Sequence, residues 1–322
     1  MGGFSIFLPM LLPYPKTFVD LPDLLALLKS RGMIVADDAA ATECLHRIGY
    51  YRLSAFWYPF RKIVSGVRTD DFLPGTHFED AIKLYDYDKE FKLLLLDALE
   101  CVEIGLRVEM AALLGKRDMY AHEDRNTFNT GFTSPVGVSR YDTWISKFHV
   151  NLDRSKAPFV VHFCRKYGDT APLPIWIAVE LWDFGLLSNA FSGLRIADQK
   201  TLAQNFSIPR GDLLKSWVRC LNYVRNVIAH HSRLWNGNIV DRPELPTIGE
   251  MTAFDPLLAI NNVSTRVYAV CCILSHLMSV IAPNSSWQNE MTALFKRFPT
   301  MPYANLQDMG IPPDWETHSF WL

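Results

Sequence analysis

The sequence lacks the short motifs that mark the commonest enzyme classes. It contains no GxxxxGK[ST] or GxGxxG phosphate loop, no HExxH helix, no GxSxG turn and no cysteine–histidine array at zinc spacing. The usual nucleotide-dependent, zinc-protease and serine-hydrolase chemistries therefore have no support in the sequence. Any catalytic site has to be built from other residues.

Cysteine pairs at regular spacing are also missing. The six cysteines include no CxxC motif, and most of them lie in apolar stretches of helix-like sequence. They are Cys44, Cys101, Cys164, Cys220, Cys271 and Cys272. A chain of this length does not need a disulfide framework to fold, so we expect free thiols and a reducing cytoplasm. For the vicinal pair Cys271–Cys272 we expect packing inside a buried helix rather than a redox role.

No apolar run is long enough to cross a membrane. The most apolar stretch, 267–282, would reach roughly 24 Å as a helix, whereas the hydrocarbon core of a bilayer is about 30 Å thick. The apolar start at 4–12 contains Pro9 and has no cation before Lys16, which is a poor signal peptide. The sequence therefore predicts a cytoplasmic protein without a membrane segment.

What is present is an apolar and aromatic composition. Of 322 residues, 49% are hydrophobic and 13% aromatic, and 20% are charged, with a formal net charge of −2. This composition excludes a disordered or collagen-like chain, because so much apolar side chain can bury a core. The near-neutral charge argues against a uniformly basic nucleic-acid binder, but it leaves local basic patches open.

Helical periodicity dominates the chain, and strand-like alternation is nearly absent, so we predict an all-α fold. We expect loops where Pro, Gly and Asn collect, including 65–75 and 126–137. The predicted organisation is an N-terminal helical module at 1–82, a helical core at 83–283, and a Pro- and Trp-containing tail at 284–322 packed on that core. The expected helices are 21–31, 39–61 (broken near Gly49), 86–115, 141–167, 176–192, 211–228 and 262–282.

A cluster of polar side chains ends one of these apolar helices. It consists of Arg225, Asn226, His230, His231 and Arg233. Arg followed closely by His arises by chance as well, as in Arg117 and His122. On an ideal helix Arg225 and His230 are about 140° apart, so they converge only if the helix ends there or if two chains share a site. The alternative is a solvated helix end, where cations suit the helix dipole.

Two further features are candidates for a supporting role. Glu103 and Arg107 lie four residues apart in the predicted helix 86–115, in the favourable order for an ion pair, which is either a surface salt bridge or part of a site. The stretch 44–69 has no acidic residue and interleaves cations with aromatic rings. Its candidates for binding single-stranded RNA are Arg47, Tyr51, Arg52, Arg61 and Lys62; the alternative is that the rings are core and the cations their solvated rim. The basic stretch 140–168 is a second candidate surface.

Several segments, in order along the chain, resemble the Abi-like (abortive infection) proteins, a branch of the HEPN superfamily of helical ribonucleases. The strongest is R-N-x-x-A-H-H-x-R-L-W-N, from Arg225 to Asn236. Others are I-G-Y-Y-R-L-S with W-Y-P-F in the range 48–60, E-I-G-L-R at 103–107, P-x-W with E and F-G in the range 174–185, and M-G-I-P at 309–312. Together the resemblance extends over roughly 14–322.

The resemblance implies a HEPN-like helical bundle and metal-independent RNA cleavage by attack of the ribose 2′-OH, without metal or cofactor. It implies that Arg225, Asn226, His230 and His231 are catalytic, with the choice of proton carrier between the two histidines left open. Glu103, Arg107 and Arg233 would support them. Partners would be RNA, a second copy of the chain, and an RNA or protein inhibitor. The alternatives are a non-catalytic module that binds RNA or a partner, and a toxin controlled by an antitoxin.

Overall fold

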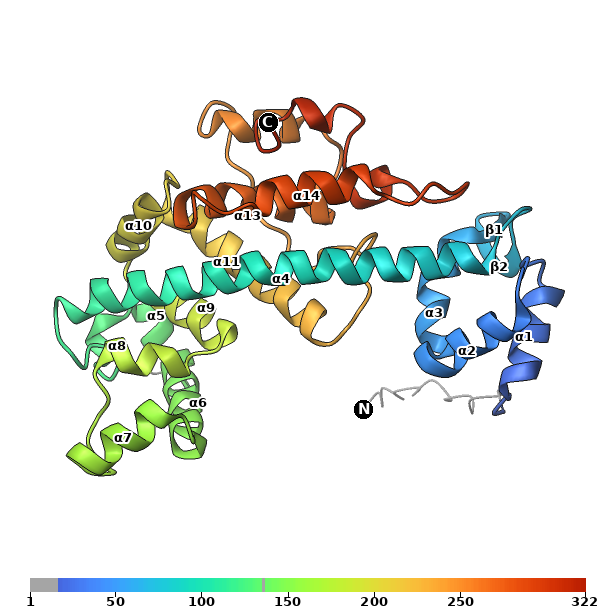
Figure 1. Ribbon diagram of the computed structural model, residues 1–322. Coiled ribbons are helices and arrows are strands. Elements are labelled where there is room, and N and C mark those ends of the chain that lie inside the picture. Colours follow the sequence, from blue (N-terminus) through green and yellow to red (C-terminus); the bar gives the residue numbers. More distant parts are fainter. Residues whose placement is uncertain (1–16, 135–136) are drawn as a thin grey trace, which may run out of the picture. The chain divides into compact units, whose positions relative to one another are not determined.

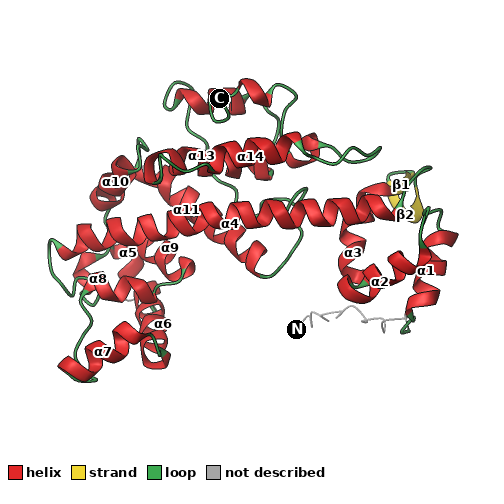
Figure 2. Cartoon of the chain, viewed as in Figure 1, coloured by secondary structure: helices red, strands yellow, loops and turns green. Residues whose placement is uncertain are grey.

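The computed structural model describes residues 17–134 and 137–322, and these residues form a mainly α-helical fold (Figure 2). In the described ranges the only sheet has two strands. The all-α prediction is therefore confirmed. The apolar start at 4–12 lies outside the described residues. Contacts along the chain define two compact units that meet between Tyr85 and Asp86.

The N-terminal unit contains three short helices: α1 (Leu21–Ser30), α2 (Asp38–Ile48) and α3 (Tyr50–Trp57). The side chains of Asp20 and Asp37 cap the first two by accepting backbone N–H groups. Between α2 and α3, Gly49 takes a positive φ of 90°, which a side chain would strain, so the helix breaks there as predicted. The core of this unit is apolar and aromatic and includes Leu28, Leu45, Leu53, Trp57 and Phe60.

A β-hairpin occupies most of the segment 61–72. Its strands are β1 (Arg61–Val64) and β2 (Val67–Phe72), antiparallel and joined by Ser65 and Gly66, both at positive φ. The prediction of a loop at 65–75 was therefore wrong for most of that range. The strands are short and carry exposed charges, so they show little of the alternation that identifies a half-buried strand.

The C-terminal unit is built around α4 (Phe78–Gly115), whose first turns lie in the N-terminal unit (Figure 1). The helices that follow it are α5 (Thr130–Thr133), α6 (Arg140–Arg154), α7 (Pro158–Tyr167), α8 (Ile175–Ala178), α9 (Phe184–Gly193), α10 (Ile196–Asn205), α11 (Gly211–Ala229), α12 (Asp255–Leu258), α13 (Val267–Ile281) and α14 (Trp287–Lys296). Short 3₁₀ turns join several of them.

Several predicted boundaries differ from the structure. The helix expected at 86–115 begins at Phe78, and the one expected at 141–167 is two helices, because Pro158 starts α7. The one expected at 176–192 divides where the side chain of Asp183 accepts the Leu186 N–H at 2.7 Å and begins α9. The helices α10 and α14 were not predicted.

The core of this unit surrounds α11 and α13. Helix α13 is buried almost throughout, and α11 packs against α9, α10 and α13. Gly105 of α4 allows a close approach to α13, since a Cβ there would lie 3.3 Å from Ile281. Cys271 and Cys272 are fully buried free thiols, which confirms their packing role, and burial raises the pKa of both. Within 17–134 and 137–322, no helix is both long and apolar enough to span a bilayer.

Candidate active site

Helix α11 holds the Arg-Asn…His-His segment at its C-terminal end. Its apolar residues, including Trp217, Leu221 and Val224, are buried, while the polar face is exposed. The helix ends in a Schellman motif: the N–H of His231 donates to the Ile228 carbonyl at 2.9 Å, and the N–H of Ser232 donates to the Val227 carbonyl at 3.0 Å. Packing of α11 therefore fixes where this segment lies.

The two histidines leave this helix end differently. His230 still donates its backbone N–H to the Asn226 carbonyl at 3.0 Å, so its Cα continues the helical spiral. His230 and Arg225 therefore remain about 140° apart around the helix axis. His231 takes the left-handed conformation, with φ of 56°, a position that usually carries glycine.

The four predicted catalytic residues and the supporting Arg233 differ in exposure. Asn226, His230 and His231 are exposed, and Arg225 and Arg233 are partly buried. In the described part of the chain, the Asn226 side chain makes no hydrogen bond to the His230 ring. The amide lies one turn before the histidine on the same face, as the sequence implied.

A buried carboxylate that we did not predict holds the loop after α11. Asp88 of α4 is fully buried, and its Oδ1 accepts the backbone N–H groups of Leu234 at 2.9 Å and Trp235 at 2.7 Å. Lys92 pairs with its Oδ2 at 2.9 Å and donates to the Ser232 carbonyl at 3.2 Å. The available signal was an acid on the apolar stripe of α4, between Leu84 and Leu95.

Glu103 and Arg107 form an ion pair that is largely buried rather than a surface salt bridge. Arg107 Nη2 lies 2.5 Å from Glu103 Oε1, and the two side chains are only 17% and 15% exposed. Arg107 also donates to the backbone carbonyl of Trp182, at 3.1 Å from Nε and 2.7 Å from Nη2. The pair therefore joins α4 to the turn before α9.

The electrostatics of Glu103 connect this pair to α11. Burial raises the pKa of Glu103, whereas Arg107 and then Arg225 lower it. Arg225 is thus near enough to act on Glu103 from a different helix. The structure brings Arg225 into one electrostatic neighbourhood with Glu103 and Arg107, which lie more than a hundred residues before it in the sequence.

A further polar residue that we did not predict, Asn222, lies one turn before Arg225. Its Oδ1 is buried and accepts no hydrogen bond within the described part of the chain. A Cβ at Gly185, near the start of α9, would lie 3.7 Å from that oxygen. The N-terminal turn of α9 therefore closes one side of the neighbourhood around Arg225.

The predicted RNA-binding residues all lie in the N-terminal unit. Arg61 pairs with Asp70 at 2.8 Å, and Arg47 pairs with Glu43 at 2.5 Å. Tyr51 is 91% exposed, Arg52 is exposed, and Lys62 is partly buried. The rings of Phe56, Trp57 and Phe60 are core, which leaves Tyr51 and Tyr58 as the exposed aromatics of this stretch.

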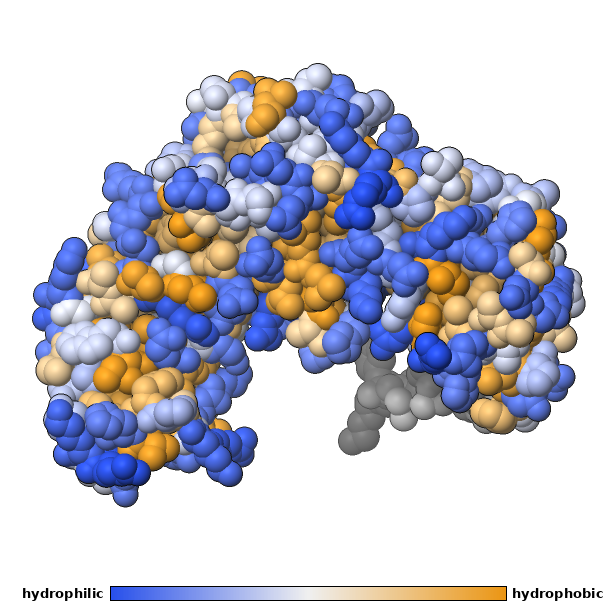
Figure 3. Space-filling model, viewed as in Figure 1, coloured by the Kyte–Doolittle hydropathy of each residue, from blue (hydrophilic) through white to orange (hydrophobic). Residues whose placement is uncertain are grey.

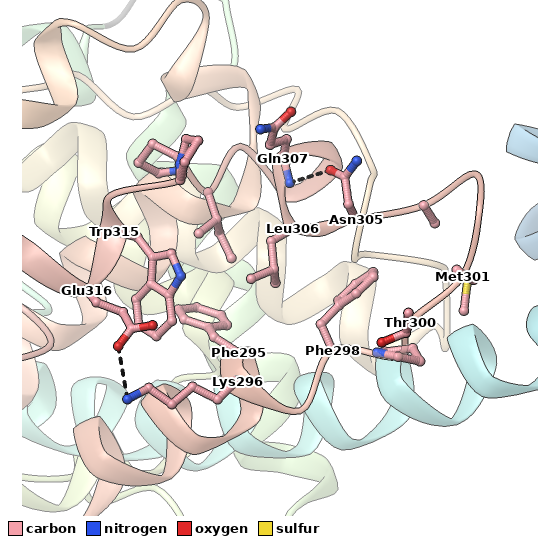
Figure 4. Close-up of a pocket in the computed structure, with 15 residues that line it drawn as sticks. Phe295, Lys296, Phe298, Thr300, Met301, Asn305, Leu306, Gln307, Trp315 and Glu316 are labelled. Carbon is pink, nitrogen blue, oxygen red and sulfur yellow. Dashed lines mark hydrogen bonds and ion pairs between the residues drawn. The ribbon is translucent and has the colours of Figure 1, made fainter.

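A pocket of about 590 Å³ lies in the C-terminal segment, away from these residues in sequence (Figure 4). Phe295, Phe298 and Trp315 give it an apolar wall, and the ion pair of Lys296 with Glu316, at 3.1 Å, lies at its side. None of the predicted catalytic residues lines it. Among the residues with described positions, no group of three or more His, Cys, Asp or Glu is arranged to hold a metal ion.

Comparison with protein-family models gives a match over more than half of the chain. The model of the Abi-like protein family matches residues 43–236. The match includes the basic aromatic stretch, the Glu103–Arg107 pair and the whole segment from Arg225 to Asn236. Searches of curated proteins and of solved structures found no match.

Proposed function

Because the chain belongs to the family of Abi-like proteins, we propose that it is a metal-independent endoribonuclease of the HEPN type that acts in abortive infection, a form of phage defence. Its substrate is RNA, cut by attack of a ribose 2′-OH on the neighbouring phosphate. The observation that carries the proposal is the segment with a partly buried Arg225 and an exposed His230, held by packing at the end of α11 and backed by a largely buried ion pair.

The chemistry of the two residues suits this reaction. Imidazole exchanges protons near neutral pH, so an exposed His230 serves as base for the 2′-OH or as acid for the leaving 5′ oxygen. The planar guanidinium of Arg225 offers paired donors to the crowded phosphoryl oxygens. Glu103 and Arg107 hold the surroundings of Arg225 and act as positioning residues. The 2′-OH requirement confines cleavage to RNA.

The separation of Arg225 from His230 around α11 supports a site shared by two copies of the chain. In a dimer with facing α11 ends, the arginine of one copy meets the histidine of the other. Apolar residues gather on the surface over the middle of α4 (Figure 3), and exposed apolar residues on this helix are Leu93, Leu96, Ile104 and Val108. Ile104 neighbours Glu103 in sequence, so a second copy covering this stripe would lie close to the proposed site.

The test uses the purified protein, a labelled single-stranded RNA and an excess of EDTA. Wild type is expected to cut the RNA, and Arg225→Ala and His230→Ala are expected to lose at least about a hundredfold in rate. His162→Ala and Arg297→Ala, which remove an exposed histidine and an exposed arginine elsewhere, are the matched controls.

A non-catalytic binding module would give a different result in the same experiment. It would retain RNA in a mobility-shift assay without cutting it. Equal cleavage by wild type and both variants would show that a contaminating nuclease is responsible, or that the reaction takes place elsewhere on the chain. Expression of wild type is also expected to arrest growth, and expression of His230→Ala is not.

A further inference from the structure

A pocket of about 420 Å³ beside α11 is lined by polar and charged residues alone. Its cations are Arg140 at the start of α6 and Lys215 and Arg219 on α11. The other lining residues are serines and an asparagine, and two acids, Asp212 and Glu244. Pockets for small organic molecules are lined mainly by apolar groups. This lining suits a ligand that is charged and makes hydrogen bonds over its whole surface.

The two acids of the pocket are partly compensated from outside it. Arg210, which does not line the pocket, pairs with Asp212, lies 3.6 Å from Glu244 and also pairs with Glu250 at 2.9 Å. The lining itself carries three cations against these two acids, and among the described residues neither Lys215 nor Arg219 forms an ion pair with them. Negative charge is the ligand property that this pocket favours.

The cations of the pocket are accessible. Lys215 is exposed and forms no ion pair within the described residues. Arg219 lies 3.8 Å from Asp241, but that pair is exposed, with 61% of the arginine side chain accessible, and solvent screens it. The Arg140 guanidinium lies over the Phe132 ring at 5.3 Å, an arrangement that leaves its N–H donors free to turn toward an anion.

Helix α11 connects this pocket with the proposed site. Lys215, Arg219, Asn226 and His230 follow one another at intervals of four, seven and four residues, so they share one face of the helix, and all four are exposed. From Arg219 to His230 the helix rises roughly 16 Å. Tyr223, four residues after Arg219, lies on the same face between them and is partly exposed.

We propose that the pocket lined by Arg140, Lys215 and Arg219 binds phosphodiester groups of the RNA strand beside the one that is cut. This inference rests on the proposed function, since it assigns a subsite to the same substrate. The strand follows the exposed face of α11, with its phosphates on the cations of the pocket and the reacting phosphate at His230, where it meets Arg225 of the second copy. Tyr223 lies along this path and offers its ring for an unstacked base to stack on.

The experiment measures binding separately from cleavage. The His230→Ala protein, which the proposed function makes inactive, is titrated with a fluorescent single-stranded oligoribonucleotide of roughly 12 nucleotides at several salt concentrations. Adding Lys215→Glu and Arg219→Glu is expected to weaken binding about tenfold or more. The slope of log K against log salt is expected to fall by about 1–2. Lys215→Gln with Arg219→Gln is expected to change both quantities in the same direction, by less.

The control reverses the same number of charges elsewhere. Lys116→Glu with Lys296→Glu, both at exposed positions outside the pocket, is expected to change affinity by less than about threefold. Thermal unfolding confirms that all variants are folded. An affinity and a salt slope equal to those of the control would overturn the subsite. Displacement of the RNA by polyglutamate at equal charge concentration would assign the pocket to an acidic peptide, and would also overturn it.

The failures of the two proposals can be told apart. RNA cleavage that depends on Arg225 and His230, together with unchanged binding in the charge-reversal variant, leaves the nuclease standing and removes the subsite. Absence of cleavage by wild type, with binding that still depends on Lys215 and Arg219, removes the nuclease and leaves an RNA-binding face.

Discussion

The buried carboxylate of Asp88 accepts the backbone N–H of Trp235 at 2.7 Å, joining two residues 147 positions apart in the sequence. The same oxygen accepts the Leu234 N–H, and Lys92 neutralises the charge at 2.9 Å. These bonds hold the chain immediately after the two histidines. The direction in which the loop leaves α11 therefore depends on a residue of α4.

Replacing Asp88 tests this anchor. Asp88→Ala leaves two buried N–H groups without an acceptor and Lys92 without a counter-ion, which is expected to lower the free energy of unfolding by about 3–5 kcal/mol. Asp88→Asn keeps an acceptor oxygen and is expected to cost less. Urea denaturation measures both variants. Asp97→Ala, an exposed acid on the same helix, is the control, and an equal loss there would remove the anchor from the account.

The Glu103–Arg107 pair predicts that the contribution of Glu103 to folding stability falls as the pH rises. Burial raises the folded-state pKa of Glu103 above its ordinary value, so the folded protein binds this proton more tightly than the unfolded chain does. The resulting stabilisation is present below the ordinary pKa and is lost as the pH rises through the raised folded-state pKa. Arg107 limits this rise in pKa.

Arg107→Met removes that compensation. The variant is expected to lose about 2–4 kcal/mol of stability at pH 8 and clearly less at pH 5, where Glu103 takes up a proton more readily. The double variant Glu103→Gln with Arg107→Met is expected to show little of this difference. Urea unfolding at the two pH values provides the comparison. The same loss at pH 5 and pH 8 would contradict a buried carboxylate held by Arg107.

His231 occupies a backbone conformation that glycine adopts without strain. His231→Gly is therefore expected to stabilise the protein by roughly 0.5–1 kcal/mol, whereas His231→Ala, which keeps a Cβ at φ of 56°, gains nothing. Thermal unfolding distinguishes the two variants. Because His230 is the proposed proton carrier, cleavage is expected to survive in His231→Gly. Loss of cleavage in a stabilised His231→Gly protein would transfer that role to His231.

His122 is a fully buried histidine outside the proposed site. Neither ring nitrogen makes a hydrogen bond in the described part of the chain, and burial lowers the pKa of the ring to about 4. The folded protein therefore resists protonation that the unfolded chain accepts. The stability contributed by the neutral ring is present above pH 6.5 and is lost as the pH falls toward 4.

His122→Phe is expected to remove this acid sensitivity. Between pH 7.5 and pH 5, wild type is expected to lose about 2 kcal/mol more than the variant. Phenylalanine suits the site, since the rings of Phe148 and Trp182 lie at 5.4 and 6.3 Å. Chemical denaturation at both pH values measures the difference. Parallel losses in the two proteins would show that folding does not lower the pKa of His122.

The sequence predicts the helices with long apolar stripes well. Helices α11 and α13 follow from the spacing of their apolar residues, and the break at Gly49 follows from its freedom at positive φ. The hairpin at 61–72 could not be predicted from the sequence pattern, because its strands are short and charged. The start of α4 at Phe78 could not be predicted either, because Asp80, Asp86 and Asp88 interrupt the apolar pattern there.

The candidate site is predictable only in part. The motif at 225–236 is continuous in sequence, so its residues can be named without a structure. The proximity of Arg225 to Glu103, and the anchoring of Trp235 by Asp88, depend on where the fold places α4 relative to the end of α11. Periodicity shows which face of each helix is buried, but not which other helix it meets.

The chemistry of the RNA ends tests the central claim most directly. A labelled single-stranded RNA is incubated with the purified protein in EDTA, and the cleavage products are identified by mass spectrometry. Attack by the 2′-OH predicts 2′,3′-cyclic phosphate on one fragment and 5′-hydroxyl on the other. A single 2′-deoxy substitution at the cleaved position is expected to block cleavage. The Arg225→Ala and His230→Ala proteins are expected to produce neither the cyclic phosphate end nor the 5′-hydroxyl end. Products with 5′-phosphate, or cutting that survives the 2′-deoxy substitution, would contradict the account.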